Sequence, residues 1–174
     1  VVAANPKPFV AANGVTIAPD GGFDERVPDI VCVPVIMVPP GESLDGRFGD
    51  EIAWLRRCHA AGATVATACS GAMLLGEAGL LDGHDPTTHW AYCDVMRSRY
   101  PRTRVHPQRA LVVTGEQRRS SDRRPLLLVA RGTALDRGAF FVVALVARQA
   151  LGGALAGIGG KRLSVAYVGA LVAV

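Results

Sequence analysis

Cys69 is the residue whose type and position first suggest chemistry. It follows the apolar run 63–68 and precedes Ser70, Gly71 and the helix-like segment 72–81. A sharp turn from a strand into a helix exposes a side chain, and the amino end of the helix favours a thiolate. This order predicts an exposed nucleophile with a lowered pKa, and it makes the backbone N–H of Ser70 a candidate oxyanion donor. The alternative is packing, because free cysteine is among the most buried residue types.

His89 is the candidate partner of Cys69. It lies in the stretch Thr87-Thr88-His89-Trp90, 20 residues (89 − 69) after the cysteine. That separation lets the chain run out along one helix and return to the same edge of a sheet. A neutral imidazole there accepts the thiol proton, and a protonated one stabilises the thiolate. The alternative is a histidine that caps a helix or packs in the core, with Thr87 or Thr88 as an ordinary cap.

The other candidate ligands match no known site. Cys32 and Cys58 fall at apolar positions and are expected in the core. There is no Cys-x-x-Cys or His-x-x-x-His spacing, and the glycines of 152–160 fit neither a P-loop nor a dinucleotide fingerprint. We therefore expect no metal and no cofactor. Three histidines in polar turns or at a helix end are expected on the surface: His59, His84 and His106.

Apolar spacing predicts the elements that position Cys69 and His89. Strands are expected at 29–34, 63–68 and 110–114, helices at 44–61, 72–81 and 90–99, and a strand or hairpin region at 1–22. The run 29–34 lacks alternation, which is typical of a strand buried on both faces. Strands that alternate with helices predict an α/β fold with a parallel sheet covered on both faces.

Composition indicates one globular domain and argues against several other classes. The 174 residues are 49% hydrophobic and 20% charged. The four scattered cysteines do not form a disulfide framework, and the longest apolar run, 139–147, is too short to span a membrane. Without a leader before Val1, we expect a cytoplasmic protein. The net charge is +4, but residues 1–122 hold 12 Lys and Arg against 14 Asp and Glu, so direct nucleic-acid binding is not expected.

Residues 63–83 and 87–90 resemble the ThiJ/PfpI superfamily, and more narrowly the amino-terminal domain of GlxA-type AraC-family transcriptional regulators. The shared patterns are Cys-(Ser/Thr)-Gly, Ala-Gly-Leu-Leu-Asp-Gly and Thr-Thr-His-Trp, and the likeness covers 9–116. It implies a flavodoxin-like three-layer sandwich, the fold of class I glutamine amidotransferases, with a mostly parallel sheet. Cys69 would stand at a nucleophile elbow with His89 nearby. Peptidases of the superfamily carry histidine after the elbow cysteine, where this chain has Ser70, so peptidase activity is not expected.

The resemblance also sets expectations for the domain. We expect a single ThiJ/PfpI-like domain over 1–174. Family domains begin with a further strand and helix whose acidic residue reaches the cysteine, and we expect this segment to be missing before Val1. Its absence would leave Cys69 without a carboxylate and one sheet edge bare. Residues 118–174 match the family poorly, so no site residue is assigned there.

Two functions from different classes follow. The first is a ligand-sensing or dimerising domain of an AraC-family regulator. It would bind an unknown small molecule and reach DNA only through a helix-turn-helix domain not present in this chain. The second is an isocyanide-hydratase-like lyase or another cysteine-dependent hydrolase that uses Cys69, Ser70 and His89. A third interpretation is a scaffold without catalytic activity, whose elbow serves folding. The bare edge and the apolar segment 139–151 favour a homodimer. The missing acid favours the sensor, because a nucleophilic Cys–His pair needs a third group to orient the imidazole.

Overall fold

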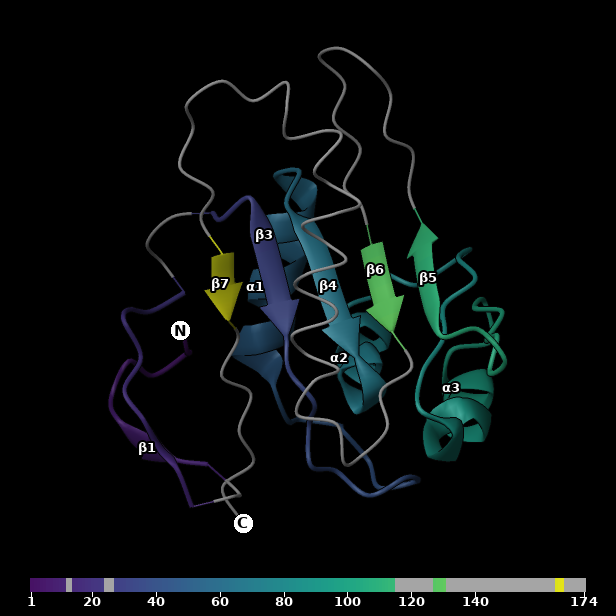
Figure 1. Ribbon diagram of the computed structural model, residues 1–174, viewed down its shortest axis with the longest axis horizontal. Coiled ribbons are helices and arrows are strands. Elements are labelled where there is room, and N and C mark those ends of the chain that lie inside the picture. Colours follow the sequence, from purple (N-terminus) through teal and green to yellow (C-terminus); the bar gives the residue numbers. More distant parts are fainter. Residues whose placement is uncertain (12–13, 24–26, 115–126, 131–164, 168–174) are drawn as a thin grey trace.

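The computed structural model describes residues 1–11, 14–23, 27–114, 127–130 and 165–167. Its centre is a five-stranded sheet in the order β5-β6-β4-β3-β7 (Figure 1). The strands are β3 (Ile30–Val33), β4 (Thr64–Ala68), β5 (Leu111–Thr114), β6 (Leu127–Ala130) and β7 (Val165–Tyr167). Within this sheet only β5 and β6 pair antiparallel, so the expected mostly parallel α/β sheet is confirmed in this part of the chain.

Strands β3 and β4 place the elbow at the middle of the sheet. They pair in parallel from Ile30 opposite Thr64 to Val33 opposite Thr67. All four residues of β3 are buried, as its unbroken apolar run predicts. Because β3 and β4 run in the same direction, the loop that follows β3 and the turn that follows β4 leave the sheet at the same edge.

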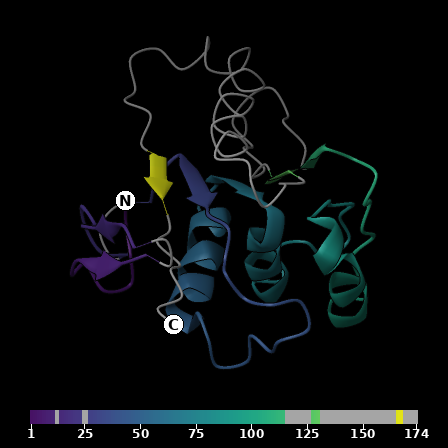
Figure 2. The same cartoon turned by 60° about the horizontal axis from the view of Figure 1, so that its bottom comes forward.

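Two helices cover one face of this sheet (Figure 2). Helix α1 (Gly49–Ala60) begins five residues later than predicted, because Gly46 and Phe48 adopt left-handed φ angles of 71° and 58°. Helix α2 (Ala72–Glu77) ends earlier than predicted, because Gly79 adopts a φ of 71°, as glycines that end helices commonly do. The guanidinium of Arg56 in α1 donates to the carbonyls of Glu77 and Ala78, which ties α1 to the end of α2.

The remaining elements are short. The predicted helix 90–99 is a 3₁₀ turn, η2 (Trp90–Tyr92), that continues into α3 (Cys93–Arg99). The expected hairpin near the start consists of β1 (Phe9–Val10) and β2 (Thr16–Ile17). Our prediction contained neither β6 nor β7. The apolar segment 139–151 lies outside the described residues, and the predicted cover of the second face of the sheet stays a prediction.

The core lies between the sheet and the two helices. Leu55 of α1 and Leu74 of α2 are fully buried against Val31 and Val65 of the central strands. Gly76 permits a close approach, because a Cβ atom there would lie 2.4 Å from the ring of Tyr100. In the described ranges, every helix is too short or too polar to cross a bilayer.

Candidate functional site

Cys69 stands on a tight elbow at the carboxyl end of β4. The chain passes from the extended residue Ala68 into a 3₁₀ turn, η1 (Cys69–Gly71), and then into α2. Cys69 has a φ of 55°, a left-handed conformation that is unusual for a residue with a side chain. At Gly71 a Cβ atom would lie 2.3 Å from the Thr67 hydroxyl oxygen and 2.5 Å from the Pro34 carbonyl oxygen. The elbow therefore needs glycine at this position.

Ser70 holds the elbow against the loop that follows β3. Its hydroxyl donates to the Ile36 carbonyl at 2.7 Å and accepts from the Ile36 N–H at 3.1 Å. The Thr67 hydroxyl donates to the Val33 carbonyl at 3.1 Å and adds a second connection between β4 and β3. Ser70 is completely buried, so its side chain serves the packing of the elbow.

The environment of Cys69 differs from the prediction. The residue is only 6% exposed, and burial raises the pKa of its thiol. The backbone N–H and the hydroxyl of Ser70 lower the same pKa, but by less than burial raises it. The prediction of an exposed thiol with a lowered pKa is therefore wrong, because neighbouring segments remove the water that would solvate a thiolate.

The segment that carries His89 does reach the elbow. The Thr88 hydroxyl donates to the Cys69 carbonyl at 2.8 Å. His89 is 9% exposed, and its Nδ1 accepts from the Ala91 N–H at 3.3 Å, so it caps η2. We assign the proton of neutral His89 to Nε2, because Nδ1 acts as an acceptor. In this tautomer Nε2 is a donor and cannot accept a thiol proton, and among the described residues no hydrogen bond joins the His89 ring to Cys69.

Tyr92 is a residue of the site that the sequence analysis missed. Its hydroxyl donates to the Val38 carbonyl at 2.7 Å. Burial raises the pKa of Tyr92. The Ser70 hydroxyl lowers this pKa in part, and a charge on Cys69 raises it further. Its ring lies edge-on to the His89 ring, with 6.2 Å between the centroids. The sequence feature that could have identified Tyr92 is its position three residues after His89, in the turn η2.

The other predicted positions lie apart from this chemistry. Cys32 and Cys58 are buried, as expected, and burial raises the pKa of Cys58 to about 11. The remaining histidines are partly buried and not fully on the surface. His84 shares a 2.8 Å hydrogen bond with Thr114. Among the residues that the structure describes, no carboxylate forms a hydrogen bond with Cys69 or His89.

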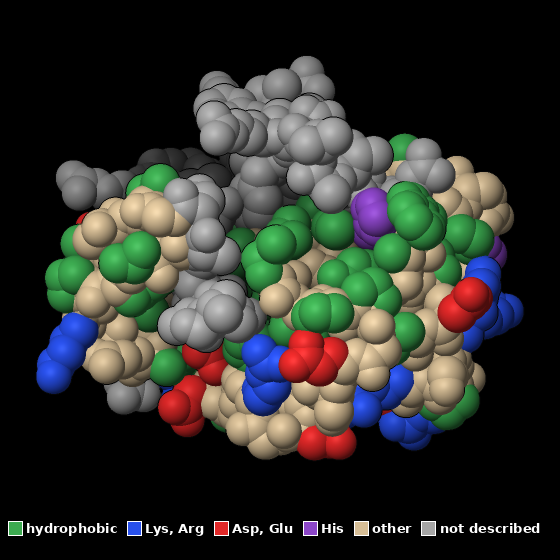
Figure 3. Space-filling model, turned by 90° about the horizontal axis from the view of Figure 1, so that it is seen from below, with side chains coloured by type: hydrophobic (Ala, Val, Ile, Leu, Met, Phe, Trp, Pro, Cys, Tyr) green, Lys and Arg blue, Asp and Glu red, His purple; other side chains and the backbone are tan. Residues whose placement is uncertain are grey.

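Apolar side chains gather at the edge of the sheet toward which β3 and β4 point. Figure 3 views this edge and shows hydrophobic side chains at its centre, with acidic and basic side chains below them. Exposed apolar residues occur in the loop after β3 and beside His89: Val35 is 39% exposed, Met37 63% and Trp90 73%. A surface with an apolar centre and a charged rim is typical of a binding face.

A parallel sheet with a cysteine on a strained strand-to-helix turn defines the class of α/β proteins with a nucleophile elbow. Comparison with known families assigns the chain within this class. The sequence profile of the DJ-1/PfpI family matches residues 1–119. The chain belongs to the DJ-1/PfpI family, which confirms the ThiJ/PfpI resemblance and its flavodoxin-like fold.

Similar proteins include regulators and an enzyme. The chain is 32% identical over 106 residues to the HTH-type transcriptional regulator CdhR of Pseudomonas aeruginosa, covering 60% of this chain and 30% of CdhR. It is 34% identical over 92 residues to isonitrile hydratase of Pseudomonas putida, covering 51% of this chain and 38% of the enzyme. A crystal structure of a regulator-like protein from Vibrio parahaemolyticus superposes with a TM-score of 0.62 at 17% identity, covering 94% of this chain and 78% of that protein. The chain thus spans less than two fifths of either sequence relative.

Proposed function

We propose that this chain is the sensing domain of an AraC-family transcriptional regulator of the GlxA type. The elbow region would bind a small molecule, and the domain would form a homodimer in the cytoplasm. DNA binding would belong to a separate helix-turn-helix domain, in keeping with the name of the relative CdhR. The observation that carries the proposal is the burial of the Cys69 thiol, which is only 6% exposed and has a raised pKa.

The burial of Cys69 argues against nucleophilic catalysis. A thiol with the ordinary pKa of about 8.5 is only about 3% thiolate at pH 7, and a raised pKa lowers that fraction further. His89 does not compensate, because its Nδ1 caps η2, which assigns the proton of the neutral ring to Nε2. In the described ranges no carboxylate orients the His89 imidazole. A Cys–His pair in this state lacks both an activated thiolate and a general base.

Isonitrile hydration is the second candidate function. It is favoured by the 34% identity to the Pseudomonas putida enzyme and by the left-handed conformation of Cys69. Strained residues cluster at functional sites, and a binding site can retain such a residue as well as an active site can. The two functions differ in what they require of Cys69. The enzyme needs thiolate chemistry at this residue, whereas the sensor needs only its shape and packing.

The deciding experiment measures turnover and ligand binding on the same samples. Wild-type protein, Cys69→Ala and His89→Ala are assayed for isonitrile hydration and are screened for ligands by thermal shift. We expect no turnover from any of the three and a saturable rise in melting temperature with a ligand. Wild-type turnover that falls by about 10²-fold or more in His89→Ala would establish the enzyme instead.

Two further measurements test parts of this proposal separately. The rate of Cys69 alkylation by iodoacetamide against pH should have its midpoint above that of a free cysteine, because burial raises the pKa of the thiol. A midpoint below about 8 would restore the nucleophile. Size-exclusion chromatography with light scattering should show a homodimer, and a monomer near 18.2 kDa at high concentration would remove the dimerising role.

A further inference from the structure

The loop 34–48, which we call the strap, runs from β3 across the elbow to α1. At its start its side chains alternate: Ile36 and Val38 point inward and are 1% and 3% exposed, whereas Val35 and Met37 face solvent. This alternation is that of an extended segment with one apolar face against the core. Described residues from two other segments hold the strap in place. Ser70 bonds to both backbone groups of Ile36, and the Tyr92 hydroxyl bonds to the Val38 carbonyl.

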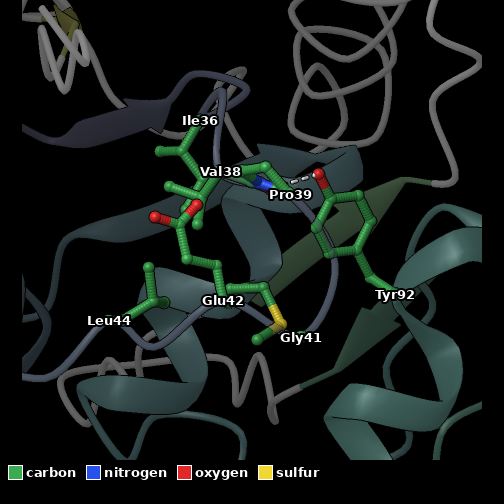
Figure 4. Close-up of a pocket in the computed structure, with 8 residues that line it drawn as sticks. Ile36, Val38, Pro39, Gly41, Glu42, Leu44 and Tyr92 are labelled. Carbon is green, nitrogen blue, oxygen red and sulfur yellow. Dashed lines mark hydrogen bonds between the residues drawn. The ribbon is translucent and has the colours of Figure 1, made fainter. Parts of the chain in front are cut away.

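A small apolar pocket lies beneath the strap (Figure 4). Its volume is about 10 Å³, which is room for about one water molecule. Its walls include Ile36, Val38, Leu44, Met73 and the ring of Tyr92. These side chains offer a water few hydrogen-bond partners, so the space suits a methyl or methylene group better than a water. At the lip, the exposed carboxylate of Glu42 is 3.4 Å from the Arg47 guanidinium, so this charge is already paired.

The pocket borders the elbow. Met73 belongs to α2, four residues after Cys69. Ile36 is the hydrogen-bond partner of Ser70, the residue after Cys69, and the Tyr92 ring lies edge-on to the His89 ring, with 6.2 Å between the centroids. Tyr92 thus forms a wall of the pocket, lies beside the His89 ring and holds the strap through Val38. Breaking the Tyr92–Val38 bond would free the first part of the strap from η2, the turn that leads into α3. Among the described residues, Ser70 would still hold the strap at Ile36, and Arg99 would still hold it at Asp45.

We propose that this pocket is a subsite for a short aliphatic group and that the Tyr92–Val38 hydrogen bond is the latch that closes the strap over it. The inference rests on the proposed sensing function and specifies which chemistry the site takes. With the latch closed, the pocket has room for about one methyl group and the Cys69 side chain is shielded. With the latch open, the strap moves outward, the pocket lengthens along its apolar walls, and the thiol becomes accessible from the same opening.

The latch predicts a measurable change in access to Cys69. A neutral hydrogen bond of this kind is worth about a 2- to 13-fold change in an equilibrium constant. Tyr92→Phe removes the donor and keeps the ring, so iodoacetamide should modify Cys69 about 2- to 10-fold faster. Tyr100→Phe is the control, because it also removes a tyrosine hydroxyl, one that bonds to the Met73 carbonyl and to Glu77 and not to a backbone group of the strap. The fully buried Cys58 reports global unfolding in each sample.

The expected result is a faster Cys69 reaction in Tyr92→Phe only, with the Cys58 rate unchanged. Equal Cys69 rates in the wild type and Tyr92→Phe would overturn the latch. A parallel rise at Cys58 would also overturn it, because the faster reaction would then report unfolding. Mass spectrometry after timed quenching resolves the two cysteines.

A chain-length series on the wild-type protein tests the subsite itself. Methyl and butyl methanethiosulfonate both convert a thiolate to a mixed disulfide and release methanesulfinate. If an aliphatic subsite borders Cys69, the butyl reagent should react severalfold faster there than the methyl reagent, relative to the same ratio for free cysteine. A ratio equal to that of free cysteine would overturn the subsite. Should Tyr92→Phe not fold, this series decides the subsite alone, and hydrogen exchange at strap amides in the wild type decides the latch.

The tests of the latch and the subsite can fail or succeed independently of the test of the proposed sensing function. The thiol probes need no natural ligand, so the latch and subsite can be established in a protein for which no ligand raises the melting temperature. In that case the sensing function fails and the subsite stands. Conversely, ligand stabilisation with no chain-length preference and no effect of Tyr92→Phe would support sensing at another place and overturn this inference.

Discussion

Gly71→Ala is the sharpest test of how the elbow is built. Gly71 has a φ of −60°, which alanine adopts without strain, so the substitution tests space alone. The added methyl carbon would lie 2.3 Å from the Thr67 hydroxyl oxygen and 2.5 Å from the Pro34 carbonyl oxygen. The Pro34 atom belongs to the backbone of a loop held by Ser70, so relief requires a shift of the elbow away from β3.

The expected loss of stability follows from three contributions. Overpacking a close-packed site costs about 1–3 kcal/mol. Displacing Thr67 from its bond to the Val33 carbonyl costs about 1 kcal/mol more. Replacing glycine by alanine in a helical conformation returns about 0.5–1 kcal/mol. The sum is a destabilisation of about 1–3.5 kcal/mol, which corresponds to a fall in melting temperature of about 3–10 °C for a chain of this size.

Urea unfolding followed by circular dichroism measures the effect, with Gly49→Ala as the control. Gly49 begins α1 without a left-handed φ, and no neighbouring atom lies within 4 Å of the place that an added methyl carbon would take, so alanine there should be neutral or slightly stabilising. In a Thr67→Ala background, Gly71→Ala should cost about 1 kcal/mol less, because one of the two close contacts is gone. If Gly71→Ala were as stable as Gly49→Ala, the account of a close-packed elbow would be refuted.

Three further predictions concern the same region and the core. Ser70→Ala should lower the free energy of unfolding by about 1–3 kcal/mol in urea titrations, because both backbone groups of Ile36 lose their buried partner. His89→Ala should cost about 1 kcal/mol through the lost cap of η2, while His89→Asn, which keeps an acceptor, should recover most of it in thermal unfolding; equal losses would argue against capping. Stability should fall between about pH 9 and 11, because unfolded thiols lose protons that the folded chain retains. Cys58, with its pKa raised to about 11, contributes to this fall, so Cys58→Ala should flatten the pH dependence of the urea midpoint.

Much of the fold could be predicted from local patterns. The unbroken apolar run before Pro34 predicted a strand buried on both faces, and β3 is fully buried. The order of strand, small-residue turn and helix around Cys69 predicted the elbow, because its residues are adjacent in the chain. Helix ends were predicted less well: left-handed φ angles at Phe48 and Gly79 set the start of α1 and the end of α2. Strands β6 and β7 were missed because they are short segments that pair with distant partners, β4 and β3.

The sequence by itself determined the Cys-Ser-Gly turn and the return of segment 87–90 to the elbow, although it did not predict that Thr88 would bond to the Cys69 carbonyl. Only the tertiary structure decided what those residues can do. The pKa of Cys69 depends on how much water remains around the thiol, and neighbouring segments distant in sequence, including the strap, set that quantity. The proton of His89 is placed by a backbone N–H two residues away, and Tyr92 enters the site through a carbonyl 54 residues before it. Solvation and hydrogen bonding between residues far apart in the sequence follow from tertiary packing, so local sequence patterns cannot predict them.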